Sequence, residues 1–373
     1  MSTPISLFDY HLPIEQIAQF PVEPRDSSRL LVLGRGRETL RPGSGPSGGE
    51  DVGNIEHRRF FEIVDYLRAG DVLVMNDTKV FKARLRGLVN GKEIECFLLR
   101  SREGNSEGNW FWQALIKPGR KAKIGDVIDL GGLSTMVRLK NSDGTVLLSF
   151  EIPPAEVIAF ANEHGEVPVP PYVKKAPEKS DLYQTVYARE TGSVAAPTAG
   201  FHFTKELLQK IKDLGVQIEF MTLHVGIGTF RPVKTETLEA HEMHSELVEI
   251  KAEVAERINQ AKTEGRRIIS VGTTTVRALE GVANLNKGKL PESGFVGEVN
   301  IFITPGFKFK VIDALITNFH LPKSTLIVLV SALAGRERVL AAYEAAVKEG
   351  YRFYSFGDAM FAESASSPNP FSF

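Results

Sequence analysis

The sequence predicts an α/β (α+β) body into which a small β-barrel domain is inserted. Its 373 residues exceed what one ordinary hydrophobic core needs, so two domains are expected. From about Thr78 to Ile152, short alternating segments separated by Gly and Pro turns are typical of a barrel. Beyond Thr204, helical and strand patterns alternate as in α/β sheets. We therefore expect a discontinuous body of residues 1–77 and 153–373, with a barrel at 78–152.

Composition narrows the class of protein. Hydrophobic residues make up 42% and charged residues 24%, which is ordinary for a globular protein. A single cysteine, Cys96, excludes a disulfide framework and a cysteine-based zinc site. The N-terminus lacks a signal-peptide pattern, and the longest apolar run, Leu326–Ala334, is far shorter than the ~20 residues that span a bilayer. We expect a cytoplasmic protein with a flexible Gly-rich loop at 34–54.

The elements follow in chain order. In the barrel, strands are expected at Glu93–Leu99 and Trp110–Ile116, with a hairpin at Met136–Phe150. In the body, hydrophobic periodicity and capping residues predict helices at Ala155–Glu163, 205–214 (after an N-cap at Thr204), Lys251–Glu264, Thr274–Val282 and Arg336–Lys348. Strands are expected at Val216–His224, Arg266–Val271, Val311–Thr317 and Tyr351–Phe356. The apolar run Thr325–Ala334 fits either a buried helix or a strand.

Polar or Gly-rich turns follow the expected strands. In Ser270–Glu280 (SVGTTTVRALE), a glycine and three threonines open a helix, which indicates either an anion site or simple N-capping. In Leu223–Pro232, Gly226 and Gly228 allow close backbone approach to a ligand, but a third glycine is missing for a dinucleotide fingerprint. Similar turns occur at 75–79, 194–204, 317–325 and 354–358. Because α/β sheets bind ligands at strand ends, these turns predict the site.

Two further patterns have competing interpretations. His241 and His244 are three residues apart without an evident third ligand, so a metal is not expected. The net charge is −1, yet cations cluster at 79–86 and 117–123. Such clusters are either solvated surface or, if they converge on one face, a track for a polyanion.

Read together, these segments resemble the S-adenosylmethionine:tRNA ribosyltransferase-isomerases of queuosine biosynthesis. The resemblance covers nearly the whole chain in order, and it rests on DVLVMNDTKV (71–80), KPGRK (117–121), GEVPVPPYV (165–173), DLYQTVYA (181–188), VAAPTAGFHFT (194–204), TLHVGIGTFRPV (222–233), HEMHSE (241–246), VGTTTVRALE (271–280), ITPGFKFKVIDALITNFHLPKSTL (303–326) and YRFYSFGDAM (351–360). Only the Gly-rich loop is longer than the family usually carries.

The resemblance implies an α/β body with a β-barrel lobe and an unusual use of S-adenosylmethionine as a ribosyl donor, without a metal. It further implies that the acceptor is the aminomethyl group of 7-aminomethyl-7-deazaguanine at the wobble position of tRNA, and that the products are epoxyqueuosine-tRNA, adenine and methionine. The rival interpretations are an S-adenosylmethionine-dependent methyltransferase, for which the N-terminal strands offer no Gly-rich loop, and a non-catalytic RNA-binding protein.

This chemistry needs a base near the ribose C5′, donors for the nucleoside and cations for tRNA. Histidine is favoured as the base because its pKa lies near neutrality, and the candidates are His202 as first choice, then His224, His320, Glu298 and Asp358. Candidates for binding S-adenosylmethionine are Gly226, Gly228, Thr229, Phe230, Gly272, Thr273, Thr274, Thr275, Arg277 and Asn318. Candidates for binding tRNA are Lys79, Arg84, Arg86, Lys117, Arg120, Lys121 and Lys323.

Overall fold

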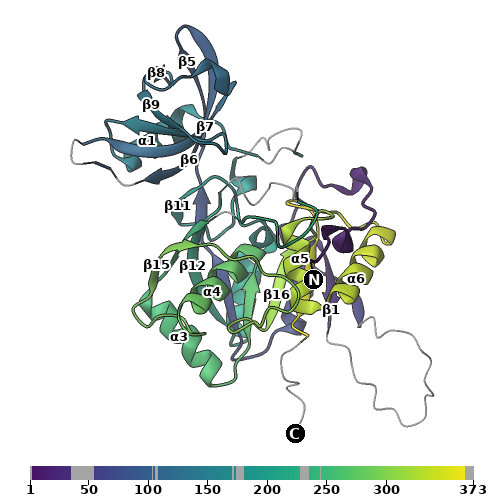
Figure 1. Cartoon of the computed structure of the whole chain (residues 1–373). Coiled ribbons are helices and arrows are strands. Elements are labelled where there is room, and N and C mark those ends of the chain that lie inside the picture. Colours follow the sequence, from purple (N-terminus) through teal and green to yellow (C-terminus); the bar gives the residue numbers. More distant parts are fainter. Residues whose placement is uncertain are drawn as a thin grey trace, which may run out of the picture.

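The structure, a computed structural model, describes residues 2–34, 54–102, 104–105, 108–169, 172–173, 180–226, 235–243 and 245–365. The predicted fold class is confirmed, because a mixed α/β body carries a closed six-stranded barrel (Figure 1). Nearly all of the Gly-rich loop expected at 34–54 lies outside the described residues. No helix in the described ranges is long and apolar enough to cross a membrane.

The body is built on a sheet that has nine strands in the described part of the chain. Their spatial order is β15 (Phe295–Val299), β13 (Glu246–Ile250), β12 (Gln217–His224), β3 (Val72–Asn76), β14 (Ile268–Val271), β16 (Ala314–Asn318), β17 (Ala359–Glu363), β1 (Arg29–Leu33) and β2 (Ile55–Arg59). β12, β3, β14 and β16 are parallel to their neighbours within this central group. Their carboxyl ends therefore meet at one edge of the sheet.

Helices cover both faces of this sheet. Along β3, Val72 and Val74 face one core and Leu73 and Met75 face the other, as alternation along a strand requires. The first core is completed by α3 (Ala252–Thr263), α4 (Thr273–Leu285), α5 (Thr325–Ala334) and α6 (Arg336–Lys348). The second is completed by α2 (Lys205–Asp213) and the 3-10 helix Phe60–Tyr66. Coverage on both faces explains why all residues of β3, β14 and β16 are buried.

The barrel closes in the order β10-β7-β6-β5-β8-β9. Its strands are β5 (Arg84–Val89), β6 (Lys92–Arg102), β7 (Trp110–Lys117), β8 (Val127–Asp129), β9 (Ser134–Lys140) and β10 (Val146–Phe150). Helix α1 (Pro154–His164) packs Val157 and Ala161 into the barrel core, so this helix beyond the expected boundary at 152 sits with the barrel (Figure 1). A parallel pair, β4 (Thr78–Val80) and β11 (Glu190–Ser193), lies where the barrel joins the body.

The elements expected from the sequence are found close to their predicted bounds, with one clear error, whereas β1, β2, β13, β15 and β17 were not predicted. The expected strand Tyr351–Phe356 is wrong, because the segment is irregular, Tyr354 has a φ of 75°, and the last strand is β17. Tyr351 and Phe353 are buried against Phe319, and this packing imitates the alternation of a strand. The ambiguous run Thr325–Ala334 is a helix.

Capping explains where two of the helices begin. The predicted N-cap Thr204 accepts a hydrogen bond from the Leu207 N–H (3.1 Å), and Ser324 caps α5 in the same way (3.3 Å). The remaining short elements are 3-10 turns at Ile5–Phe8, Ile14–Gln16, Arg25–Ser27, Gly119–Lys121, Ser180–Tyr183 and Thr198–His202.

Candidate active site

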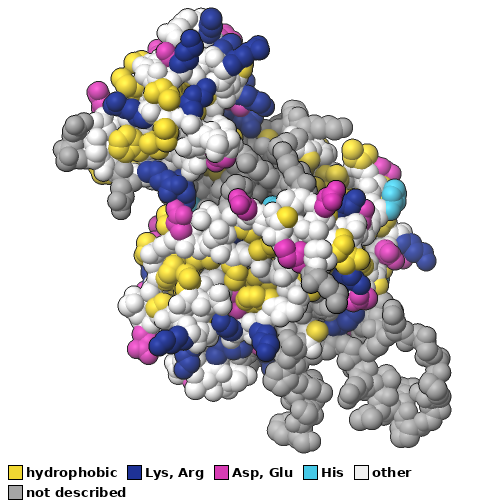
Figure 2. All heavy atoms as spheres, viewed as in Figure 1, with side chains coloured by type: hydrophobic (Ala, Val, Ile, Leu, Met, Phe, Trp, Pro, Cys, Tyr) yellow, Lys and Arg dark blue, Asp and Glu magenta, His cyan; other side chains and the backbone are white. Residues whose placement is uncertain are grey.

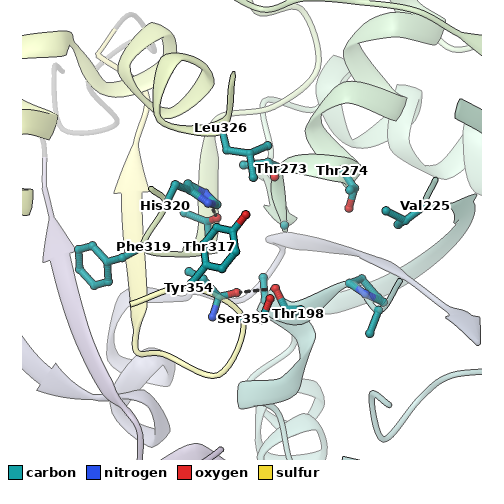
Figure 3. Close-up of a pocket in the computed structure, with 15 residues that line it drawn as sticks. Thr198, Val225, Thr273, Thr274, Thr317, Phe319, His320, Leu326, Tyr354 and Ser355 are labelled. Atoms are coloured by element: carbon teal, nitrogen blue, oxygen red, sulfur yellow. Dashed lines mark hydrogen bonds between the residues drawn. The ribbon is translucent and has the colours of Figure 1, made fainter. Parts of the chain in front are cut away.

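A first cavity, the body cavity, opens at the carboxyl ends of β14 and β16 and measures about 50 Å³ (Figure 3). It brings together five of the turns singled out in the sequence, although the last of them, at 354–358, does not end a strand. Its walls include Thr198, Val225, Gly272, Thr273, Thr274, Thr317, Asn318, His320, Tyr354 and Ser355. The expectation that strand-end turns converge is therefore met by the geometry of this edge.

The N-terminus of α4 forms one wall of the body cavity. Gly272 precedes the helix with a φ of 89°, a conformation that favours glycine, and Thr273 and Thr274 line the cavity. The first N–H groups of a helix have no intrahelical partner, so this wall suits an anion. Thr275 turns away and donates to the Val271 carbonyl (2.8 Å). Arg277 also lies elsewhere, in a buried ion pair with Glu246.

His320 forms the opposite wall (Figure 3). Its Nε2 lies 2.9 Å from the Thr317 hydroxyl, and no described residue hydrogen-bonds to its Nδ1. Burial lowers the pKa of His320 to about 3, so the ring is neutral at physiological pH. His320 can thus exchange hydrogen bonds with a ligand, but it is a weak base.

His202 is buried behind this cavity with both ring nitrogens occupied. Nδ1 lies 2.7 Å from the Ser28 hydroxyl, and Nε2 accepts from the Asn318 amide at 3.1 Å. Burial, followed by Arg352 and Arg25, lowers the pKa of His202 to about 3. The Asn318 oxygen in turn accepts from the Thr198 hydroxyl (3.1 Å). The ring is therefore arranged to fix Asn318 and Thr198 rather than to receive a proton.

A second cavity, the interdomain cavity, lies between the barrel and the body and measures about 380 Å³. The body supplies Thr191, Gly192, His224, Val225, Gly226 and Glu246, and the barrel side supplies Arg100, Trp112, Gln113, Asp143 and Thr145. Val225 lines both cavities, which places them side by side at the end of β12.

The end of β3 holds the end of β12 in place. The Asn76 side chain accepts from the Leu223 N–H (3.1 Å) and donates to the Leu223 carbonyl (3.0 Å). The Asp77 carboxylate accepts from Thr222 (2.8 Å) and pairs with Arg189 (2.8 Å). The turn at 75–79 was predicted to contribute to the site as a strand end. No periodicity reveals that it braces a strand about 145 residues further on.

His224 stands at the junction of the two cavities. Its Nδ1 lies 2.9 Å from the Thr78 hydroxyl, and Nε2 has no hydrogen-bond partner among the described residues. The Thr78 hydroxyl is also 3.5 Å from the Glu190 carbonyl, to which it can donate its proton. In that arrangement the hydroxyl oxygen accepts a hydrogen bond from the protonated Nδ1 of His224, so Nε2 carries the free lone pair. Burial lowers the pKa of His224, while Asp77 and Glu190 raise it in opposition. His224 is thus neutral at physiological pH, with its basicity partly preserved.

Neither carboxylate candidate lines either cavity. The Asp358 oxygens accept from the backbone N–H groups of Arg29 (2.9 Å) and Arg352 (2.8 Å), which ties two chain segments together. Glu298 on β15 pairs with Arg100 (2.9 Å) and Arg102 (3.0 Å) of the barrel. Burial raises the pKa of Glu298, but these two arginines outweigh burial and hold the pKa below its usual range.

The predicted tRNA-binding cations are spread over the molecule. Figure 2 shows many Lys and Arg side chains over the barrel. Lys117 pairs in register with Glu95, seven residues along β6 from Arg102, or about 23 Å. Lys121 donates to the Glu93 carbonyl nearby, and Arg120 is exposed in the same turn.

The other four predicted cations have different settings. Arg84 and Arg86 are near Glu95 and Glu166. Lys323 pairs with Asp9 on the body (2.7 Å). Lys79 is exposed and pairs in register with Thr191. Because Thr191 lines the interdomain cavity, Lys79 lies next to that cavity.

Some predicted residues fall outside the described ones, namely Gly228, Thr229, Phe230 and His244. His241 packs edge-on against Phe302. Across the described ranges no group of three His, Cys, Asp or Glu side chains is arranged for a metal. The barrel wall of the interdomain cavity was not predicted, because Arg100 and Gln113 occur in strands with ordinary alternation.

Comparison with known proteins points to one family. The family model described as queuosine biosynthesis protein matches residues 5–362. The chain is also similar to a crystal structure of S-adenosylmethionine tRNA ribosyltransferase from Thermotoga maritima. That similarity has 39% identity and a TM-score of 0.53, and it covers 95% of this chain and 99% of the other.

Proposed function

The chain belongs to the family of queuosine biosynthesis proteins, and from this membership we infer that it is an S-adenosylmethionine:tRNA ribosyltransferase-isomerase. The resemblance drawn from the sequence motifs is thereby confirmed at the level of the family. We place the enzyme in the cytoplasm, where it meets its tRNA. The acceptor in our proposal is 7-aminomethyl-7-deazaguanine at the wobble position, and the products are epoxyqueuosine-tRNA, adenine and methionine.

We assign the site mainly because the body cavity and the interdomain cavity are adjacent and share Val225 in their walls. The body cavity, at about 50 Å³, holds only a small polar group, and its helix N-terminus suits the methionine carboxylate. The interdomain cavity, at about 380 Å³, lies within the usual range for a ligand of nucleoside size. We therefore place the reacting ribose at the junction and the flipped acceptor base against the barrel wall.

In this proposal His224 is the general base. The sulfonium makes the C5′ protons acidic, Nε2 of His224 takes one of them, and the remaining electron pair stays on C5′ beside the positive sulfur. That pair forms a C4′=C5′ double bond and breaks the C4′–O bond of the ring, and the freed oxygen becomes the C1′ carbonyl as adenine leaves with the C1′–N electrons and a proton. The substrate amine then adds to C4′ and loses a proton, and the pair restored on C5′ attacks C1′ to close the carbocycle. The resulting C1′ alkoxide attacks C5′ to form the epoxide, which breaks the C5′–S bond and releases methionine. His224 is preferred to His202 because both nitrogens of His202 are bonded. It is preferred to His320 because Asp77 and Glu190 sustain the basicity of His224.

The experiment incubates the protein with S-adenosylmethionine, labelled separately in its adenine and methionine parts, and tRNA carrying the acceptor base. Equal release of adenine and methionine is the expected result. Release of S-adenosylhomocysteine would instead identify a methyltransferase, and binding of tRNA without release of either product would identify a non-catalytic binder.

A variant then tests the base. His224→Gln should slow adenine release by about 10²- to 10⁴-fold, the usual contribution of a general base. S-adenosylmethionine binding by calorimetry should be retained, because the methionine end is held by the other cavity. A variant with unchanged turnover would remove His224 from this role while leaving the overall activity established by the product assay.

A further inference from the structure

We propose that Arg100 and Arg102 bind the tRNA backbone at the edge of the interdomain cavity, and that Glu298 keeps them in place when tRNA is absent. This proposal rests on the proposed function, since it identifies where that enzyme receives its tRNA. Both arginines lie on β6 of the barrel, and Glu298 lies on β15 of the body. Neither arginine was among the cations selected from the sequence.

The three side chains form a cluster with surplus positive charge. Oε1 of Glu298 accepts from Arg100 (2.9 Å) and from Arg102 (3.0 Å), so one carboxylate serves two guanidinium groups. Two positive charges and one negative charge leave a net charge of +1 on this cluster. Burial and the neighbouring Arg102 both lower the pKa of Arg100, although Glu298 raises it. A second anion would relieve this repulsion, and a phosphate fits the guanidinium geometry.

The cluster lies at the edge of the interdomain cavity, and hydrogen bonds orient its Arg100 guanidinium. Arg100 lines the interdomain cavity, and its Nε donates to Gln113 (3.2 Å). Gln113 donates to Thr145 (3.1 Å), so the guanidinium is oriented from the barrel wall as well as by Glu298. Arg102 is two residues further along the strand and therefore on the same face, with its side chain 42% exposed. A nucleotide whose base enters the cavity would bring its flanking phosphates to this edge.

The position of the cluster separates it from the other cations of the barrel. Lys117 pairs with Glu95, which is five residues from Arg100 and seven from Arg102 along β6, or about 17 and 23 Å. Phosphates next to a base held in the interdomain cavity cannot reach that distance. Arg100 and Arg102 are thus better placed for the anticodon loop than Lys117, which could contact only another part of the tRNA.

The test measures binding of a fluorescently labelled tRNA carrying the acceptor base, without S-adenosylmethionine, across a range of salt concentrations. Arg102→Gln should weaken binding about five- to eightfold at 0.1 M salt and lower the slope of log Kd against log salt by about 0.7–0.9, as one lost phosphate contact predicts. Lys212→Gln, which removes an exposed charge near the opposite end of β12, is the matched control and should change neither quantity.

The Glu298→Gln variant distinguishes two roles of the cluster, namely binding of a tRNA phosphate and an ion pair that only holds the barrel against the body. It removes the competing carboxylate, so binding should tighten and the salt slope should steepen. If Glu298→Gln weakens binding as Arg102→Gln does, with an unchanged salt slope in both, the cluster only joins the domains and the proposal is overturned. An unchanged affinity of Arg102→Gln would overturn it as well. Adenine release by the wild-type enzyme is scored separately, so failure of the proposed function is recognised independently.

Discussion

Replacing Gly192 by alanine should disable the enzyme while leaving it folded. Gly192 lies on β11 and packs against the ring of His224. A Cβ at this position would lie 2.7 Å from Cε1, 2.8 Å from Nε2 and 3.0 Å from Nδ1 of that ring. Gly192 does not have a positive φ, so the backbone itself tolerates alanine. The whole effect therefore falls on the position of His224.

The size of the effect follows from these distances. Carbon atoms in contact prefer separations of about 3.5 Å, so the ring must move by about 0.8 Å. A movement of this size away from Thr78 would lengthen the 2.9 Å contact between Nδ1 and the Thr78 hydroxyl to about 3.7 Å, beyond hydrogen-bonding range. A misplacement of about 1 Å can cost about 100-fold in rate. Overpacking of this kind costs about 1–3 kcal/mol of unfolding free energy, which a chain of this size can tolerate.

Single-turnover release of adenine, with saturating S-adenosylmethionine and tRNA, measures the rate, and urea denaturation measures stability. Gly34→Ala is the matched control, because its added Cβ would meet only the Asn54 carbonyl oxygen at 3.8 Å, at the opposite edge of the sheet. Its rate should equal that of the wild type. A Gly192→Ala enzyme with wild-type turnover would show that the orientation of His224 does not matter, and our choice of base would fail.

Three further outcomes are expected. The folded-state pKa of His202 and of His320 is about 3, well below the unfolded value of about 6.5, so the unfolded chain takes up protons first as the pH falls. Each histidine should therefore remove about 1 kcal/mol of unfolding free energy per pH unit between about pH 6 and 4. Urea denaturation across this range should show a smaller slope for a His320→Gln variant, because that variant lacks the contribution of His320. Glu280 accepts hydrogen bonds from three backbone N–H groups at 310–312 (2.9, 2.9 and 3.0 Å), so Glu280→Ala should cost at least about 3 kcal/mol in urea denaturation, and a loss below about 1 kcal/mol would contradict this account. Lys121→Glu should weaken tRNA binding by about tenfold at low salt if the far end of the barrel contacts the tRNA, and unchanged affinity and salt slope would exclude that contact.

The location of the candidate site could be predicted from the sequence because it depends on a general property of parallel strands. Glycine, threonine and histidine after separate strands must meet at one edge once those strands align, whatever their spacing in the chain. Gly272 and Asn318, 46 residues apart, line the same cavity for this reason. The segment at 354–358 was placed there for a wrong reason, because it is not the end of a strand, yet Tyr354 and Ser355 do reach the cavity.

The roles of single residues could not be predicted in the same way, because they depend on partners that no local pattern specifies. His202 was the first choice of base, but Ser28, 174 residues earlier, occupies its Nδ1. Asp358 has the right chemistry, yet its oxygens accept backbone N–H groups that only the folded chain brings near. Tertiary contacts determine the pKa of a side chain and which of its hydrogen-bonding groups are unoccupied. Residue type and turn position therefore identify candidates but do not rank them.

The inserted barrel and the chemistry in the body are coupled through one short segment. Asn76 and Asp77 fasten the end of β3 to β12, and the very next residue, Thr78, contacts the Nδ1 of His224. From Thr78 the chain runs through β4 directly into the first barrel strand. A displacement of the barrel therefore acts on the residue that orients the proposed base, and tRNA that engages Arg100 on the barrel would bear on the same joint. In our proposal the barrel is therefore a wall of the active site as well as a surface for RNA.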